Sequence, residues 1–291
     1  MRQQIEALFS ALPDGIHEQQ LQNFELLLIK GSWGELALAR QGAQVLHFRP
    51  AGEAPLLWIS DCAKAPPAPI RGGVPLCWPW FGDHPSQAGQ PAHGVARTAR
   101  WDWRLQNAGA DGVQLRAEPT RNLWSGLEVG LEVRVRGSAI ELLLESRNVA
   151  QQPVELTQAL HSYLAVADVG RIEILGLRDC DYLDKLRDGR RASQDGELRV
   201  ESALDRVYRH TGVTEVLDPV LQRRLRVAKS GSGSTVVWNP GVGAAGLSDV
   251  GMDQQPRFVC VEAANTGLDP VRLAPGESRR IGTVLSVGPL A

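Results

Sequence analysis

The stretch from residue 127 to residue 147 constrains the fold of this chain more than any other. Aliphatic side chains occupy every second position from Leu127 to Val135, and Glu, Gly and Arg occupy the positions between them. Since side chains of a β-strand alternate between its two faces, this period of two predicts a strand with one buried face. Gly137-Ser138 can then turn the chain into a second, antiparallel strand over 139–147.

Short strand-like runs recur along most of the chain, and helical spacing is rare between them. They cover 25–29, 35–39, 44–48, 112–117, 154–166, 221–227, 234–238 and 257–262. The exception is 1–12, where apolar residues have helical spacing until Pro13-Asp14-Gly15 ends the pattern. These features predict a large antiparallel sandwich or barrel. We expect one all-β domain over 1–291, with 1–20 as an N-terminal helical extension, because neither a repeat nor a linker interrupts the chain.

Charge and cysteine usage argue against several function classes. Lys and Arg number 31 against 33 Asp and Glu, whereas nucleic-acid and membrane-surface proteins usually carry a basic excess. Apolar runs stay well short of the roughly 20 residues that span a bilayer, and the N-terminus shows no secretion signal. The four cysteines (Cys62, Cys77, Cys180 and Cys260) form no CxxC pair. We therefore expect reduced thiols, no zinc site and a cytoplasmic location.

The segment from Ile70 to Trp103 is the most informative about function. Glycine and proline break regular structure there, yet they alternate with aromatic residues and with Arg71 and Arg97. Aromatic faces beside guanidinium groups suit a ligand that is part ring and part anion, such as a sugar phosphate. The alternative is a buried, kinked loop held by its tryptophans. His93 lies within this segment and is a plausible site residue.

Two further residues can carry proton chemistry. In the predicted strand 154–166, His161 lies in mid-strand on the face that also carries Thr157, Ala159 and Tyr163. It is either a core histidine bonded to a carbonyl or a proton donor and acceptor near neutral pH. Glu262 stands near the end of a run that is apolar on both faces, which predicts a strand buried on both sides. A carboxylate there is either a hydrogen-bonded structural group or a base with a shifted pKa.

The remaining polar candidates are weaker. Asp205 can contact a ligand hydroxyl or cap a turn, and Asp249 follows strong turn residues and is expected to be structural. The other four histidines are expected at the surface: His17, His47, His84 and His210. P-loop, GxGxxG, HExxH and GxSxG motifs are absent from the sequence, so nucleotide cofactors and serine-type hydrolysis lack support.

Taken together, these motifs resemble the hexose-6-phosphate branch of the aldose 1-epimerase family over roughly residues 25–285. The carriers are RGGVPLCWPWFG at 71–82, HGVAR at 93–97, ALHSY at 159–163, DRVY at 205–208, WNP at 238–240 and FVCVE at 258–262. The resemblance implies a galactose-mutarotase-like antiparallel β-supersandwich with few short helices. It also implies an isomerase that interconverts the α and β anomers of a hexose 6-phosphate, glucose 6-phosphate above all.

The resemblance also assigns roles to residues. His161 matches the family's general acid and Glu262 its general base. Arg71 and Arg97 match phosphate-binding arginines, and Asp205 matches a residue that binds sugar hydroxyls. Ala92 departs from the pattern, because some relatives carry a Gln sugar contact there.

We expect neither cofactor nor metal, a small sugar phosphate as the ligand, and a monomer or weak homo-oligomer. The alternatives are a non-catalytic sugar-phosphate sensor on the same fold, and a polysaccharide lyase or glycoside hydrolase on a similar sandwich.

Overall fold

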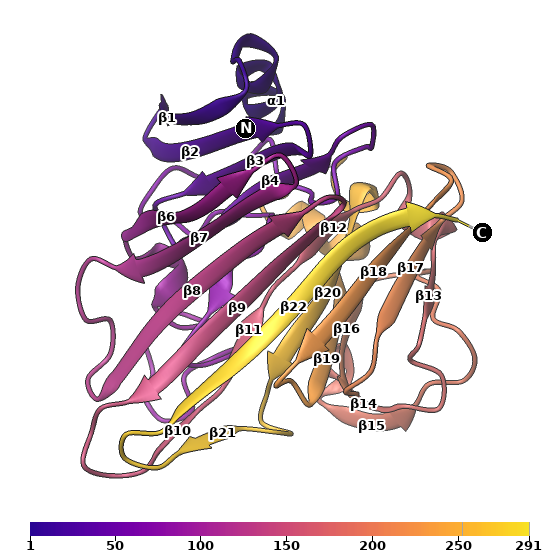
Figure 1. Ribbon diagram of the computed structural model, residues 1–291. Helices are drawn as coiled ribbons and strands as arrows, with labels where there is room; N and C mark the ends of the chain where they lie inside the picture. Colours follow the sequence, from indigo (N-terminus) through magenta and orange to yellow (C-terminus); the bar gives the residue numbers. More distant parts are fainter. Residues whose placement is uncertain (252, 291) are drawn as a thin grey trace.

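The computed structural model describes residues 1–251 and 253–290, and most of its regular structure is β-strand. Two eight-stranded sheets lie against each other, and a smaller four-stranded sheet with one α-helix lies at one end (Figure 1). Strands β10 (Val154–Leu156) and β21 (Val271–Leu273) form a separate pair. Neighbouring named strands run antiparallel throughout these sheets. The predicted all-β antiparallel sandwich is confirmed.

The first large sheet contains the alternating segment with which the sequence analysis began. Leu127–Arg136 is strand β8 and Ala139–Asn148 is β9, joined at Gly137 and Ser138 as predicted. In spatial order the sheet consists of β13 (Glu173–Leu175), β17 (Thr214–Asp218), β18 (Arg223–Ser230), β22 (Ser278–Pro289), β9, β8, β7 (Gly112–Pro119) and β6 (Trp101–Gly109).

The second large sheet contains the segments that carry the family resemblance. In spatial order it consists of β15 (Arg190–Ser193), β14 (Asp181–Asp184), β16 (Leu204–Arg209), β19 (Ser234–Asn239), β20 (Phe258–Asn265), β11 (Gln158–Leu160) and β5 (Leu76–Cys77). Strand β12 (Tyr163–Ala165) also pairs with β20. Every residue of β20 is buried, which confirms the prediction of a strand covered on both sides.

The main hydrophobic core fills the space between the two large sheets. The first sheet contributes residues such as Leu131 and Leu142, and the second contributes Leu160, Val237 and Val261. Alternation therefore sends odd-numbered residues of β20 into this core and even-numbered residues to the opposite face. That opposite face carries Glu262, so the pattern that builds the core also directs the carboxylate away from it.

The N-terminal part differs from the prediction. Helix α1 spans only Arg2–Ala11, and Gly15–Leu21 forms strand β1, so the expected helical extension over 1–20 is wrong in its second half. Ile5 and Phe9 of α1 pack on the four-stranded sheet of β1, β2 (Phe24–Gly31), β3 (Gly34–Ala39) and β4 (Val45–Pro50). Lys30 Nζ donates to the carbonyls of Phe9 and Leu12 and so holds the end of the helix.

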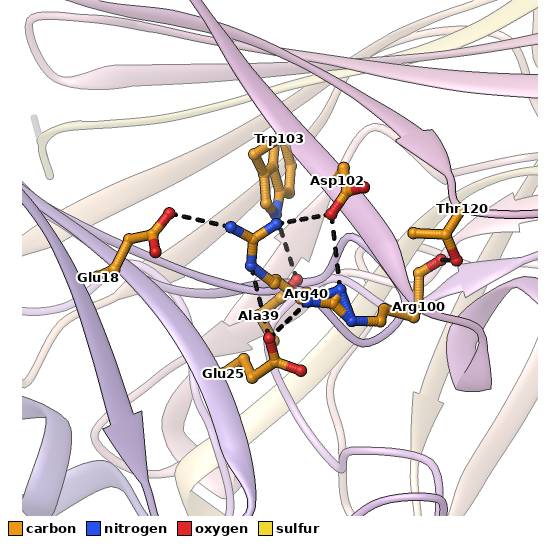
Figure 2. A network of polar contacts seen from close by, with 8 residues as sticks. All are labelled: Glu18, Glu25, Ala39, Arg40, Arg100, Asp102, Trp103 and Thr120. Atoms are coloured by element: carbon orange, nitrogen blue, oxygen red, sulfur yellow. Dashed lines mark hydrogen bonds and ion pairs between the residues drawn. The ribbon is translucent and has the colours of Figure 1, made fainter.

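A polar network joins this N-terminal sheet to the edge strand β6 (Figure 2). Arg40 contacts Asp102 at 2.7 Å and Glu18 at 2.9 Å, and Arg100 contacts Glu25 at 2.7 Å. Trp103 donates its indole N–H to the carbonyl of Ala39 at 3.3 Å. Exposed ion pairs contribute little stability singly, but this network fixes the chain just after the segment that contains Arg97.

The segment 154–166 was predicted to form one strand, but it forms three: β10, β11 and β12. His161 lies in the break between β11 and β12, where its backbone N–H bonds to the carbonyl of Pro75. The periodicity could not show this break, because the register against β20 continues unchanged across it. Short 3-10 turns complete the structure: η1 (Ala96–Thr98), η2 (Val169–Arg171), η3 (Lys185–Arg187), η4 (Gly241–Gly246) and η5 (Gln255–Arg257).

Candidate active site

His161 and Glu262 lie opposite each other across two paired strands. Leu160 pairs with Ala263 and Tyr163 with Cys260, and this register puts position 161 against position 262. Directly opposed residues point to the same face of a sheet. The structure accordingly holds His161 Nδ1 3.4 Å from Glu262 Oε1. Strand pairing thus creates a histidine–carboxylate pair from two distant parts of the chain.

Both groups are buried and incompletely bonded. Glu262 is 1% exposed and His161 is 8% exposed, while Glu262 Oε2 and His161 Nδ1 have no hydrogen-bond partner among the described residues. Burial, reinforced by Asp205, raises the pKa of Glu262 well above its usual range, and Lys185 opposes this only in part. Burial, with His93, Arg71 and Arg97, lowers the pKa of His161 well below its usual range. Burial thus favours the uncharged form of each group, a protonated carboxyl at Glu262 and a neutral imidazole at His161.

Aromatic rings fix the orientation of the His161 imidazole. The ring of Tyr163 stacks on it with centroids 4.7 Å apart and planes within 8°. Trp238 meets it edge-on at 6.1 Å. On its far side Tyr163 belongs to an aromatic cluster with Trp58 and Phe258. This packing leaves the imidazole little freedom to rotate.

Arg71 reaches the site through a bond to Tyr163. Its Nη1 donates to the Tyr163 hydroxyl at 3.0 Å, and its Nε donates to Asp249 Oδ2 at 3.0 Å. Asp249 thus holds a site arginine, a role that its turn-rich surroundings did not reveal. Gly72 and Gly73 follow Arg71 with positive φ, and a Cβ at either would lie within 2.4 Å of the backbone of Ile59 or Val45. Only glycine fits that close approach.

His93 and Arg97 come from the same short loop. The backbone N–H of Gly82 donates to His93 Nδ1 at 3.3 Å, which leaves the ring proton of a neutral His93 on Nε2. Burial, with nearby Arg97, lowers the pKa of His93 to about 3, so the ring is neutral near pH 7. Arg97 Nη2 donates to the carbonyl of Ala92 at 2.6 Å, and its buried Nε lacks a partner within the described residues.

Asp205 on β16 has a cationic partner that the sequence analysis missed. Lys185 Nζ in η3 lies 3.8 Å from Asp205 Oδ2 and 5.6 Å from the ring centroid of Phe81. Burial raises the pKa of Asp205, and Lys185 partly offsets this. Side-chain exposure rises from 1% at Glu262 to 21% at Asp205 and 44% at Lys185. The site therefore opens to solvent on the Lys185 side.

Polar side chains hold the aromatic loop in place from behind. Thr157 Oγ1 accepts the backbone N–H of Phe81 at 2.8 Å, and the carbonyl of Gly82 accepts the N–H of His93 at 2.6 Å. Buried Trp78 donates to Ser146 Oγ at 2.9 Å, and its carbonyl accepts the N–H of Val95. The loop that presents His93 is thus bonded both to strand β9 and to the residue before β11.

The structure brings together the six residues proposed from the sequence: His161, Glu262, Arg71, Arg97, His93 and Asp205.

The prediction that His47 lies at the surface was wrong, because this histidine is 1% exposed and lies 3.5 Å from buried Glu35. All four cysteines are free thiols. Residues 1–251 and 253–290 contain no group of three or more His, Cys, Asp or Glu arranged for a metal ion, and no helix in them is long and apolar enough to cross a membrane.

Comparison with known proteins agrees with this arrangement. A family model described as aldose 1-epimerase matches residues 25–286. An Escherichia coli K12 protein named "Putative glucose-6-phosphate 1-epimerase" is 34% identical over 259 residues, covering 86% of each chain. A plant protein of the same name, from Cenchrus ciliaris, is 32% identical and covers 85% of this chain and 80% of its own. A Salmonella typhimurium crystal structure described as a "putative mutarotase" superposes with a TM-score of 0.89 at 29% identity, over 98% of this chain and 99% of its own. The chain belongs to the aldose 1-epimerase family.

Proposed function

We propose that this protein interconverts the α and β anomers of a hexose 6-phosphate, with glucose 6-phosphate as its principal substrate. The observation that carries the proposal is the buried His161–Glu262 pair, 3.4 Å apart, with Arg71, Arg97 and Lys185 close by. One acid and one base suffice to open and close a cyclic hemiacetal. Guanidinium and ammonium groups suit the phosphate of such a sugar.

In the proposed reaction Glu262 carboxylate takes the proton of the anomeric hydroxyl while His161 imidazolium gives a proton to the ring oxygen. The bond between C1 and the ring oxygen breaks, and the open-chain aldehyde forms. After rotation about C1–C2 the ring closes on the other face of the carbonyl. His161 then takes a proton from the ring-forming hydroxyl and Glu262 returns one to O1, so both groups regain their initial states.

The reactive protonation state is the reverse of the one favoured in the free protein. Both states hold one proton on the pair, so the change requires only proton transfer from Glu262 to His161. Arg71 and Arg97 lower the pKa of His161, whereas neither is among the causes of the Glu262 shift. A phosphate dianion bound at these arginines would offset their charge and favour imidazolium at His161. Substrate phosphate would therefore raise turnover as well as affinity.

A direct assay distinguishes this proposal from its alternatives. Exchange between anomeric protons of glucose 6-phosphate is followed by two-dimensional exchange NMR, with free glucose measured in parallel. Catalysed exchange that is much faster for glucose 6-phosphate supports the proposal. Tight binding without faster exchange indicates a sugar-phosphate sensor. Equal rates for both sugars would remove phosphate specificity while leaving the epimerase activity.

A further inference from the structure

Arg71 is held on several sides by protein groups that leave part of its guanidinium free. Its Nε donates to Asp249 Oδ2 at 3.0 Å, and its Nη2 lies 3.0 Å from the same oxygen. Its Nη1 donates to the Tyr163 hydroxyl at 3.0 Å, and its guanidinium carbon lies 6.0 Å from the ring centroid of Trp238. A guanidinium group has five N–H donors. These contacts engage one N–H on each nitrogen, so one on Nη1 and one on Nη2 remain for a ligand.

The backbone fixes Arg71 and Asp249 relative to each other through Ser60. The backbone N–H of Ser60 donates to the carbonyl of Arg71 at 3.1 Å, and its hydroxyl donates to the carbonyl of Val250 at 3.2 Å. Val250, next to Asp249, is buried in the aromatic cluster that contains Tyr163, and Ser60 is buried as well. The fold therefore sets the contact between the arginine and the carboxylate, whereas the side chains of an exposed ion pair are free to separate.

The Asp249 carboxylate also opposes the positive charge of Arg71. The side chain of Arg71 is 23% exposed and that of Asp249 is 16% exposed. Burial by itself would lower the pKa of Arg71, but Tyr163 and Asp249 outweigh burial and raise it. The side chain of Arg97, the other arginine of the site, donates only to the carbonyl of Ala92 within the described residues. The two arginines therefore differ, because a carboxylate balances the charge of Arg71 alone.

We propose that Asp249 is a positioning residue with two separable effects on phosphate binding at Arg71. Its acceptor oxygen fixes the direction of the two remaining N–H groups of Arg71, and its charge weakens the attraction of that arginine for an anion. The proposal rests on the proposed function for the identity of the ligand, the phosphate of a hexose phosphate. Arg71 lowers the pKa of His161, so a carboxylate beside Arg71 also favours imidazolium at His161. Asp249 thus lowers phosphate affinity and raises turnover.

The variant Asp249→Asn separates the two effects. Both Arg71 nitrogens contact a single carboxylate oxygen, so the amide oxygen of Asn can replace it while the negative charge is lost. Inorganic phosphate, titrated calorimetrically, is the probe. A unit charge on the order of 6 Å from a dianion in water changes its binding about tenfold, so this variant should bind phosphate about tenfold more tightly. Asp249→Ala also loses the acceptor and should bind phosphate about fivefold more weakly than Asp249→Asn, as for one lost hydrogen bond.

Turnover of glucose 6-phosphate gives a readout that a merely structural role would not produce. Asp249→Asn should lower both KM and kcat, whereas damage to the site would raise KM. Glu145→Gln is the matched control, because Glu145 on β9 contacts Arg280 at the same 3.0 Å and alternates to the face opposite the core residue Leu144. It should leave phosphate binding, KM and kcat unchanged. Circular dichroism should show that all three variants are folded.

Each effect has its own contrary result. Phosphate binding that is unchanged or weaker in Asp249→Asn would overturn the charge effect, and equal binding by Asp249→Asn and Asp249→Ala would overturn the orientation effect. No binding of phosphate to the unmodified protein at about 50 mM would contradict both effects together with the preference for a phosphorylated sugar. The epimerase activity is tested separately, by anomeric exchange with the unmodified protein.

Discussion

Replacing Glu262 with Gln should abolish most of the catalysis and yet stabilise the fold. Gln has nearly the same shape as the protonated carboxyl that we infer in the free protein, but it cannot accept the anomeric proton. Removing a general base typically costs at least ~100-fold in rate. A structural carboxylate would behave differently, because its loss would leave buried donors without an acceptor.

The stability gain depends on pH with a defined sign. The pKa of Glu262 is raised in the folded state, so the native protein binds more protons than the unfolded chain above the unfolded pKa of about 4.5. Its free energy of unfolding therefore falls as pH rises, by up to ~1.4 kcal/mol per pH unit, until the folded pKa is reached. The amide introduced by Glu262→Gln does not titrate. The advantage of the variant should therefore increase with pH over that window.

Glu35 offers a matched control, because its pKa is shifted in the opposite direction from that of Glu262. Burial alone would raise its pKa, but His47 and Arg49 outweigh burial and lower it to about 2 from 4.5. A shift of this size corresponds to about 3 kcal/mol of stability, present above about pH 4.5 and lost as pH falls toward 2. Glu35→Gln should therefore destabilise the protein near pH 7, and its deficit should shrink in acid.

Denaturant unfolding of the three proteins between about pH 3 and 8 measures both effects, because the midpoint and slope give the free energy of unfolding. Anomeric exchange of glucose 6-phosphate is measured on the same samples. If Glu262→Gln proves less stable than the unmodified protein by several kcal/mol, Glu262 is a structural carboxylate. If exchange stays near normal in the folded variant, Glu262 is not the base.

Four further outcomes follow from the site. His161→Ala should lower anomeric exchange at least ~100-fold while circular dichroism stays unchanged; near-normal exchange would remove His161 from the mechanism. Arg97→Ala should raise KM for glucose 6-phosphate far more than for glucose, and inorganic phosphite should accelerate turnover of glucose by the unmodified protein but not by this variant. Thr157→Val removes the hydroxyl that accepts the backbone N–H of Phe81. This variant should lower kcat while the free energy of unfolding changes little, and Thr157→Ser should restore kcat. Because only proton transfer is proposed, chelator-treated and desalted protein should keep full activity, and recovery only on adding metal would contradict the mechanism.

The sequence predicted the fold class well because alternation is a local signal. Odd and even positions of 127–136 and 258–265 do face opposite sides of their sheets. The break at His161 escaped prediction because it leaves the register intact. The second half of the N-terminal extension was mistaken for helix, and it forms β1 instead, against β2. His47 was assigned to the surface because its neighbours in the sequence do not reveal the helix that covers it.

The sequence predicted only the part of the candidate site that carries a local signal. His161, Glu262, Arg71 and Arg97 stand in distinctive local patterns, so sequence could single them out. Lys185 and Asp249 lie in unremarkable loops, and only tertiary contact with Asp205 and Arg71 reveals them. Pairing across distant strands leaves no local trace in either partner's own sequence.

Register is the physical link between this fold and its chemistry. A slip of one residue between β20 and its neighbours would turn Glu262 into the sandwich core and bring Val261 or Ala263 to the site. The same slip would expose apolar residues that now fill the core. The loss of stability would be roughly 1.5–3 kcal/mol for each large aliphatic side chain. The unfavourable burial of one carboxyl is therefore outweighed by the valines beside it. Hydrophobic alternation holds His161 and Glu262 opposite each other, even though neither contributes to the core.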